Sequence, residues 1–194
     1  MLVLVRHGES LYNKAGMFTG LVDAKLSIRG IEEARATGKD LKKQGIRFNA
    51  AYSSHLSRAY DTAEIILKET MSVIDIIEDK RLAERDYGDW SGSKKQDLFL
   101  EHGATMFKMY RRSWDAAPSN AESLKEVADR VRQWVPQLKP FAEGNKNVLV
   151  SSHGNTLRAL SVVLGFHSAE SVVDYEINTG EPIEVEWISL EKHF

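Results

Sequence analysis

The stretch LVLVRHGES, residues 2–10, begins with four apolar residues and then turns abruptly polar. A short apolar run that carries β-branched residues is typical of a buried strand. Arg6, His7 and Gly8 follow directly, so this strand is expected to deliver a cation and an imidazole to its carboxyl end. A second stretch, VLVSSHG at residues 148–154, has the same form and places His153 at its end.

Helical patterns alternate with further short apolar runs along the chain. We expect strands at residues 2–5, 48–54, 72–77, 147–152 and 183–189, and helices at 27–45, 56–67, 94–114, 124–138 and 154–165. This alternation predicts an α/β fold, a three-layer α/β/α sandwich with a mostly parallel central sheet. Residues 78–123 interrupt the rhythm and are expected to form a helical lid subdomain within a single domain of residues 1–194.

Composition limits the kind of protein. The chain of 194 residues has 26 Lys and Arg against 28 Asp and Glu, so it lacks the basic excess of a general nucleic-acid surface. No apolar run approaches the length of a membrane span, and the first run is too short for a signal-peptide core. With no cysteine, there is no disulfide framework, thiolate nucleophile or cysteine-based zinc site. We therefore expect a cytoplasmic protein with neither nucleic-acid nor membrane partners.

The two strand-end histidines point to a shared site. In open α/β sheets, ligands bind beyond the carboxyl ends of the strands, so neighbouring strands would bring His7 and His153 to one pocket. A single histidine in this setting is more often structural, but two in matching contexts favour a site. Arg6 adjoins His7, and Arg58 lies near the start of a helix. Alone, Arg58 would fit a solvated helix surface; grouped with the histidines, it indicates an anion site because a guanidinium matches phosphate oxygens.

The sequence lacks the motifs of several other kinds of active site. There is neither a phosphate-binding G-x-x-x-x-G-K-[ST] loop nor a dinucleotide G-x-G-x-x-G fingerprint. No serine stands in a nucleophile elbow, and no H-E-x-x-H pair suggests a metal site. These absences favour phosphoryl transfer without a metal, with histidine itself as the nucleophile.

An ordered series of motifs resembles the histidine phosphatase superfamily and, within it, the cofactor-dependent phosphoglycerate mutases. The likeness extends over residues 2–188. It is carried by VRHGESLYN, FTGLVDAKLSIRG, AYSSHLSRAYDTA, AERDYGDWSG, YRRSW, SSHGNTLRAL and INTGEPI.

The resemblance implies a role for each matched residue. His7 would be the phosphorylated nucleophile, Glu84 the proton donor and acceptor, and Arg6, Arg58 and His153 the holders of the transferring phosphoryl group. From spacing alone, Glu84 would instead fit a surface ion pair with a neighbouring arginine. The matched residues that would line the substrate site are Asn13, Thr19, Gly20, Gly154 and Asn155, with Arg85, Tyr87, Lys95, Arg111 and Arg112 contacting the carboxylate and far phosphate.

The implied activity is interconversion of 3- and 2-phosphoglycerate in glycolysis and gluconeogenesis, with 2,3-bisphosphoglycerate as priming cofactor. Two other classes stay open: a phosphatase of small phosphate monoesters, and a catalytically silent phosphate-binding module. Ala83 replaces the asparagine typical of the mutases, and Trp90 matches a tryptophan frequent in the phosphatases. Mutases of this kind are commonly homodimers or homotetramers, and no apolar stripe in the sequence decides between these assemblies.

Overall fold

The computed structural model describes residues 1–193, with side chains through Leu190, and is built around a five-stranded sheet. The strand order is β3-β2-β4-β1-β5, and the bounds are β1 Leu2–Arg6, β2 Ala50–Ser53, β3 Ile76–Glu78, β4 Val148–Ser152 and β5 Pro182–Val185. The first four strands are parallel and β5 runs antiparallel to β1. This confirms the predicted α/β class with a mostly parallel sheet.

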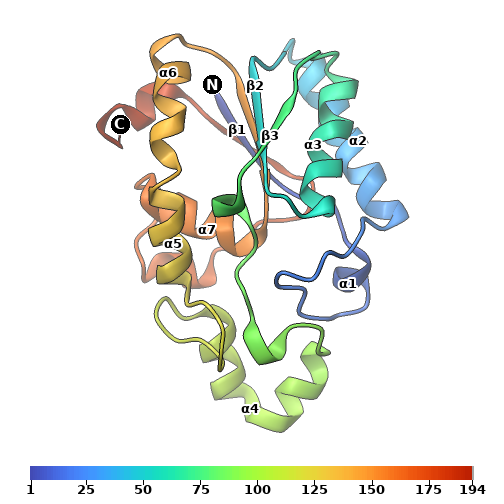
Figure 1. The fold of residues 1–194 in the computed structure, drawn as a ribbon, viewed down its shortest axis with the longest axis vertical. Helices are drawn as coiled ribbons and strands as arrows, with labels where there is room; N and C mark the ends of the chain where they lie inside the picture. The colour runs from blue at the N-terminus through green and yellow to red at the C-terminus, as the bar shows by residue number, and fades with distance from the viewer. Residues whose placement is uncertain (194) are drawn as a thin grey trace.

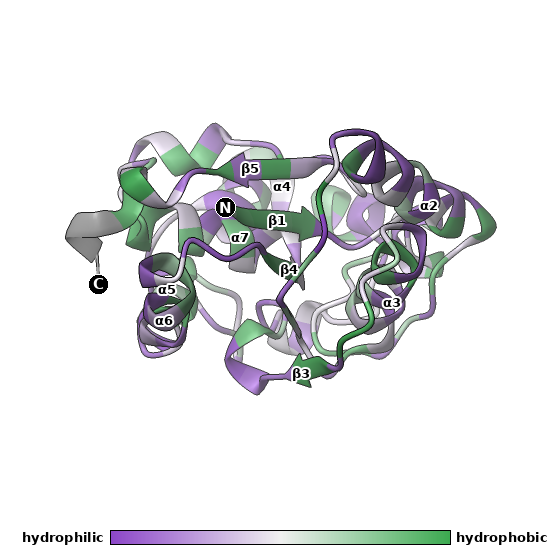
Figure 2. Ribbon diagram, turned by 90° about the horizontal axis from the view of Figure 1, so that it is seen from above, coloured by the Kyte–Doolittle hydropathy of each residue, from purple (hydrophilic) through white to green (hydrophobic). Residues whose placement is uncertain are grey.

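Helices cover both faces of the sheet, which gives the three predicted layers (Figures 1 and 2). The helices of one face are α2 Ile28–Lys43 and α3 Ser57–Glu69, and those of the other are α5 Leu124–Arg132, α6 Lys139–Glu143 and α7 Gly154–Val163. Seen from above, the strands are strongly hydrophobic while the outer helix surfaces are largely hydrophilic (Figure 2). This pattern is expected for a sheet buried on both sides.

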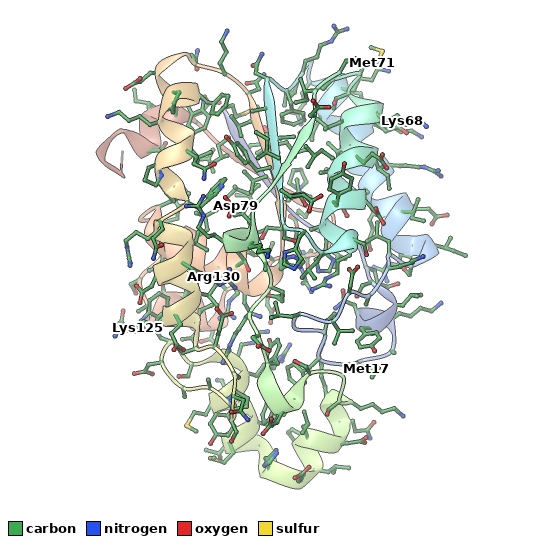
Figure 3. All side chains as sticks on the ribbon, viewed as in Figure 1. Met17, Lys68, Met71, Asp79, Lys125 and Arg130 are labelled. Atoms are coloured by element: carbon green, nitrogen blue, oxygen red, sulfur yellow. The ribbon has the colours of Figure 1, made fainter. Side chains whose placement is uncertain are left out.

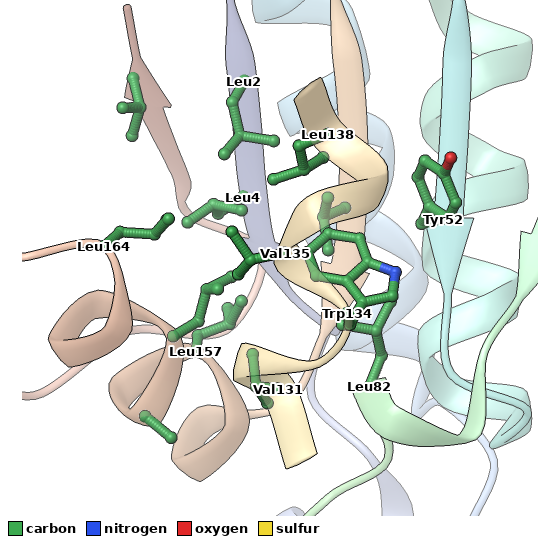
Figure 4. Close-up of a cluster of buried hydrophobic side chains, with 14 of the residues drawn as sticks. Leu2, Leu4, Tyr52, Leu82, Val131, Trp134, Val135, Leu138, Leu157 and Leu164 are labelled. Atoms are coloured by element: carbon green, nitrogen blue, oxygen red, sulfur yellow. The ribbon is translucent and has the colours of Figure 1, made fainter. Parts of the chain in front are cut away.

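Alternation along β1 divides the core into two parts. Leu2 and Leu4 pack with the residues of α5 and α7, whereas Val3 and Val5 pack with those of α2 and α3. The larger cluster centres on Trp134, which meets the ring of Tyr52 edge-on at 5.4 Å between centroids (Figure 4). Both faces of β1 are therefore packed against helices. This packing also fixes the position of His7, which directly follows the strand.

Residues 80–123 lie beyond the carboxyl ends of the strands, where α4 (Lys95–Arg112) forms the end of the molecule opposite the strand amino ends (Figure 1). Gly103 interrupts α4 with a φ of +73°, so the helix bends there. Trp90 packs against Phe18, Phe107 and Tyr110. They form a small aromatic core that is separate from the two hydrophobic clusters on the faces of the sheet.

Several predicted bounds change in the structure. Strand β3 covers residues 76–78, so only residues 76 and 77 of the predicted strand 72–77 belong to it. The chain pairs with β2 only over these three residues, and Val73 is left exposed. The last strand ends at Val185 because this residue pairs with Leu2, the first residue of β1. Trp187 lies buried beyond it, and its indole nitrogen donates to the carbonyl of Lys146. The helix expected over 124–138 divides into α5 and a 3-10 turn that contains Pro136.

One short helix was not expected from the sequence. Helix α1, Leu11–Lys14, follows Ser10, whose side chain and that of Asn13 cap each other's backbone amides. Among the helices that the structure describes, none combines the length and apolarity needed to cross a bilayer.

The turn after β1 rests on a contact between two glycines. A Cβ on Gly8 would clash with the carbonyl of Gly30, and a Cβ on Gly30 would clash with the carbonyl of Glu9. Gly30 sits in the first turn of α2, where its amide donates to the N-cap Ser27. The chain beyond His7 can therefore lie directly on the helix backbone because neither residue has a side chain.

We predict that Gly30→Ala destabilises the fold by about 2 kcal/mol or more, since the added methyl must displace backbone. Helix propensity alone would favour alanine by up to about 1 kcal/mol, so the expected sign opposes the intrinsic one. Urea unfolding measures the difference, with Glu32→Ala on the exposed face of the same helix as control. A Gly30→Ala protein as stable as the wild type would contradict the close backbone contact.

Candidate active site

The two strand-end histidines lie side by side. In the parallel pairing of β1 with β4, Arg6 is opposite Ser152, so the next residues of the two strands, His7 and His153, are neighbours. Their ring centroids are 5.0 Å apart and the rings meet edge-on at 62°. The repeated sequence pattern thus produces a single site at the carboxyl edge of the sheet.

The hydrogen bonds of His7 assign its tautomer. Nδ1 lies 2.7 Å from the carbonyl oxygen of Gly8, which can only accept, so Nδ1 carries the proton. Nε2 then holds the lone pair, in agreement with the Arg58 Nε–H that donates to it at 3.3 Å. Burial, together with the charges of Arg58 and Arg6, holds the pKa of His7 well below its usual range. A neutral ring with its lone pair on Nε2 is the form that can attack phosphorus.

Arg58 is fully buried, and hydrogen bonds to backbone carbonyls hold its guanidinium in place. Its two terminal nitrogens donate to the carbonyls of Val22 and Gly20, each at 2.9 Å. Its charge is balanced by no direct carboxylate contact in the described residues, and burial lowers its pKa. Such a desolvated guanidinium strongly favours a bound anion.

Arg6 and His153 each leave one buried nitrogen without a hydrogen-bond partner among the described residues, Nε of Arg6 and Nδ1 of His153. Nη1 of Arg6 donates to the carbonyl of Ile177 at 2.7 Å, and Nε2 of His153 lies 2.7 Å from the hydroxyl of Ser54. Buried polar atoms are rarely left unpaired, and two unpaired nitrogens on either side of His7 fit an anion between them.

Glu84 lies at the same pocket, with only 8% of its surface exposed. One carboxylate oxygen accepts the backbone amide of Arg85 at 2.8 Å. Arg130 of α5 donates to the carbonyl of Glu84 and to that of Arg81, and Figure 3 shows it reaching from α5 toward this segment. Glu84 therefore does not form the surface ion pair that its spacing suggested as an alternative.

The pocket brings together thirteen of the fifteen predicted site residues. Those in its wall are Arg6, His7, Asn13, Thr19, Gly20, Arg58, Glu84, Tyr87, Lys95, Arg111, Arg112, Gly154 and Asn155. The amino terminus of α7, at Gly154, contributes the positive end of a helix dipole. Their chemical roles remain predictions.

Two predicted site residues lie outside the pocket wall. His153 is completely buried behind it, beside His7. Arg85 is also fully buried, and its guanidinium donates to the carbonyls of Glu122, Arg111 and Ala116. This arginine therefore fastens the C-terminal end of α4, and the chain that follows it, to the chain that carries Glu84.

Five further wall residues were not identified from the sequence: Met17, Phe18, Arg158, Glu176 and Ile177. Met17 lies between α1 and the α4 segment, where the side chains of the two parts meet (Figure 3). Helical spacing could have found Arg158, because it lies four residues after Gly154 in α7. Nothing local marks Glu176, since it reaches the pocket only through the path of the loop before β5.

Arg158 organises the wall next to α7. It donates to the carbonyls of Val172 and Val173 and, at 3.1 Å, to the side-chain oxygen of Asn155. The amide nitrogen of Asn155 must then point away and donates to the hydroxyl of Tyr87 at 2.9 Å. Burial, followed by repulsion from Arg112, lowers the pKa of Arg158 to about 10.

The half of the pocket formed by α4 carries its own cations. Lys95, Arg111 and Arg112 come from the two ends of this helix. Burial lowers the pKa of both Lys95 and Arg111, and mutual repulsion within the cluster lowers them further. In all, six cationic and two acidic side chains face the pocket, so it is built to receive a ligand with more than one negative charge.

A phosphate-sized anion site around a neutral, buried histidine defines a class of enzyme that handles phosphoryl groups on histidine. The chain belongs to the histidine phosphatase superfamily (branch 1), which it matches over residues 2–190.

Relatives within the superfamily are similar over nearly the whole chain. The 2,3-bisphosphoglycerate-dependent phosphoglycerate mutase of Parvibaculum lavamentivorans is 44% identical over 188 residues, covering 96% of this chain and 90% of the relative. The phosphoglycerate mutase of Schizosaccharomyces pombe is 42% identical over 185 residues, covering 94% and 88%.

Among solved structures, a mycobacterial glucosyl-3-phosphoglycerate phosphatase in complex with VO3 aligns with a TM-score of 0.82 at 29% identity, covering 93% of this chain and 90% of that one. The α-ribazole phosphatase of Shigella flexneri aligns with a TM-score of 0.75 at 27% identity, covering 93% and 87%.

The depressed pKa of His7 predicts how stability depends on pH. The unfolded chain takes up a proton on this residue below its ordinary pKa of about 6.5, whereas the folded protein does not, so stability falls as the pH falls. Replacing His7 by Gln should reduce the loss of unfolding free energy between pH 7.5 and 5.5 by about 1 kcal/mol. Urea titrations at several pH values test this, with exposed His55→Gln as control. Equal pH dependence in His7→Gln and wild type would show that His7 is not held neutral.

Proposed function

We propose that this protein is a phosphoglycerate mutase, an isomerase that interconverts 3-phosphoglycerate and 2-phosphoglycerate through a phosphohistidine at His7. The observation that carries the proposal is the neutral His7 ring, with its lone pair on Nε2, in a cation-lined pocket. Identities of 42–44% to mutases, against 27–29% to the phosphatase structures, support isomerisation over hydrolysis.

His7 performs the chemical step. Its Nε2 lone pair forms a bond to phosphorus as the ester P–O bond breaks, and the electron pair of that bond leaves with the alkoxide oxygen. The proton on Nδ1 stays on the ring, where the Gly8 carbonyl stabilises the positive charge that the ring develops. The lone pair that accepted the Nε–H of Arg58 is consumed, and the same N–H would then donate to an oxygen of the phosphoryl group bound at Nε2.

Glu84 moves the proton. A carboxyl group at this position can protonate the leaving alkoxide and, as carboxylate, deprotonate the next attacking hydroxyl. In a mutase that hydroxyl would belong to a monophosphoglycerate, so transfer from phosphorylated His7 would leave both carbons phosphorylated. This bound intermediate would then return the other phosphoryl group to His7. In a phosphatase the attacking hydroxyl would belong to water.

The orphaned nitrogens of Arg6 and His153 fit the phosphoryl group that is transferred. They would donate to its oxygens together with Arg58, and the first amides of α7 would add the positive end of that helix. Asn13, Thr19 and Gly20 would complete this half of the site. Donors fixed in advance stabilise charge without reorganising during the reaction.

Lys95, Arg111 and Arg112, with Tyr87, would bind the carboxylate and the second phosphate. When bound, 2,3-bisphosphoglycerate supplies the phosphoryl group that primes His7, and these cations fit its charge. Arg85 would act indirectly, by holding the C-terminal end of α4, on which Arg111 and Arg112 stand. No metal is proposed.

We further propose that residues 1–194 form one domain in which 78–123 act as a lid, and that the enzyme is cytoplasmic. Its partners would be small phosphoglycerates, with neither nucleic acid nor membrane. A homodimer or homotetramer is the expected assembly.

A direct assay separates the mutase from the alternatives. Purified protein is given 3-phosphoglycerate with and without trace 2,3-bisphosphoglycerate, and 2-phosphoglycerate and inorganic phosphate are measured. A mutase forms 2-phosphoglycerate and is stimulated by the bisphosphate. Phosphate release that dominates under both conditions would identify a phosphatase and reject the proposal, and a protein that forms neither product would be a phosphate-binding module.

His7→Ala should abolish acid-labile, base-stable phosphate labelling and reduce turnover by a factor of a hundred or more, since the nucleophile itself is lost. Labelling from the bisphosphate, read after acid and base treatment, provides the measurement. A variant that still labels and turns over would mean that another residue is the nucleophile.

Lys95→Met should raise the KM for 3-phosphoglycerate about tenfold or more, because a partly buried charge that faces the ligand is lost. It should also increase the share of released inorganic phosphate, since the bound intermediate is held less tightly. Its exposed neighbour provides the control: Lys94→Met should leave both quantities unchanged. The same KM in both variants would remove Lys95 from the substrate site.

A further inference from the structure

One carboxylate in the pocket has no part in the proposed chemistry. Glu176 lies in the loop between the 3-10 turn Ser171–Asp174 and β5, and it lines the pocket next to the cations of α4. It forms an ion pair with Arg112 of α4. A negative charge in a wall that is otherwise prepared for an anionic ligand requires an explanation.

The two partners differ in exposure. The side chain of Arg112 is 12% exposed, whereas that of Glu176 is 66% exposed, so the carboxylate covers the guanidinium from the solvent side. An ion pair with one partner this exposed contributes little stability and is easily broken. Glu176 can therefore leave Arg112 when another anion arrives.

The influence of Glu176 extends beyond its direct partner. Its charge favours the protonated forms of Lys95, Arg111 and Arg158, each of which has a pKa lowered by burial. In the free protein, Glu176 thus acts as counter-ion for these three side chains as well as for Arg112. A ligand anion placed there would supply the same compensation and would meet the carboxylate as a like charge.

We propose that Glu176 is a specificity-determining residue that occupies the place of the ligand's far anionic group in the free enzyme and competes with it for Arg112. The inference rests on the proposed function in one respect, namely that the far cations bind the second anionic group of a phosphoglycerate. Glu176 then weakens the binding of two-ended anions, while a single phosphate beside His7 does not meet it. The carboxylate thereby limits how long a doubly charged ligand stays bound.

The test measures binding rather than turnover. Glu176→Gln and Glu176 proteins are compared in a His7→Ala background, which prevents phosphoryl transfer, by calorimetric titration with 3-phosphoglycerate and with inorganic phosphate. We expect Glu176→Gln to bind 3-phosphoglycerate about threefold to fivefold more tightly, the range expected for losing a weak ion-pair competitor. The affinity for inorganic phosphate should not change.

Glu181→Gln provides the matched control. Glu181 belongs to the same loop, is exposed, accepts a hydrogen bond from Asn178 and does not line the pocket. Its replacement removes the same formal charge from the protein and should change neither affinity. A gain in this control equal to that of Glu176→Gln would reveal a general charge effect and overturn the inference.

Other outcomes also decide the matter. If Glu176→Gln binds 3-phosphoglycerate equally or more weakly, then Glu176 only positions Arg112, and the inference is wrong. It is also wrong if inorganic phosphate gains as much as 3-phosphoglycerate, or if neither protein binds 3-phosphoglycerate. Failure of the proposed function would show separately, as absence of 2-phosphoglycerate in the wild-type assay, and the binding comparison does not depend on that result.

Discussion

The site depends on the hydrogen bond between Nδ1 of His7 and the carbonyl of the next residue, Gly8. This bond decides which ring nitrogen carries the proton and so where the lone pair points. It requires the backbone after β1 to turn at once, which brings Gly8 against Gly30 of α2. The same turn places the amide of Gly8 3.1 Å from the hydroxyl of Thr62 on α3. The direction of the nucleophile is therefore determined by how two helices pack on the sheet.

Electrostatics explains why the site needs so much buried structure. Arg58 and Arg158 are desolvated and are paired mostly with backbone carbonyls, which compensate a full positive charge only in part. The fold bears this cost in the free protein. A bound phosphate would recover it by accepting hydrogen bonds from the nitrogens of Arg6 and His153 that have no partner among the described residues.

The sequence allowed prediction of features that depend on local pattern. The apolar run before His7 predicted a central strand, and its counterpart before His153 predicted the neighbouring strand. The α4 residues Lys95, Arg111 and Arg112 could be assigned through the family resemblance alone, because their helical face carries weak amphipathicity. Glu176 escaped prediction because its position depends on a loop whose path is set by tertiary contacts. Likewise, the last strand ends earlier than its alternating pattern predicted because its partner β1 begins at Leu2, opposite Val185.

Strand β1 has hydrogen-bonded neighbours on both edges and packed cores on both faces. Amides in such a strand exchange with solvent only when the whole domain opens, whereas a peripheral segment such as 80–123 can open locally. His7, the proposed nucleophile, thus directly follows the strand that is most completely surrounded by packing and pairing. The cations that would grip the far end of a ligand stand on a helix that is interrupted at Gly103. The residue that would bond to phosphorus and the residues that would retain the ligand therefore stand on regions of different rigidity. Substitutions in α4 could change how long a ligand stays bound without disturbing the geometry around His7.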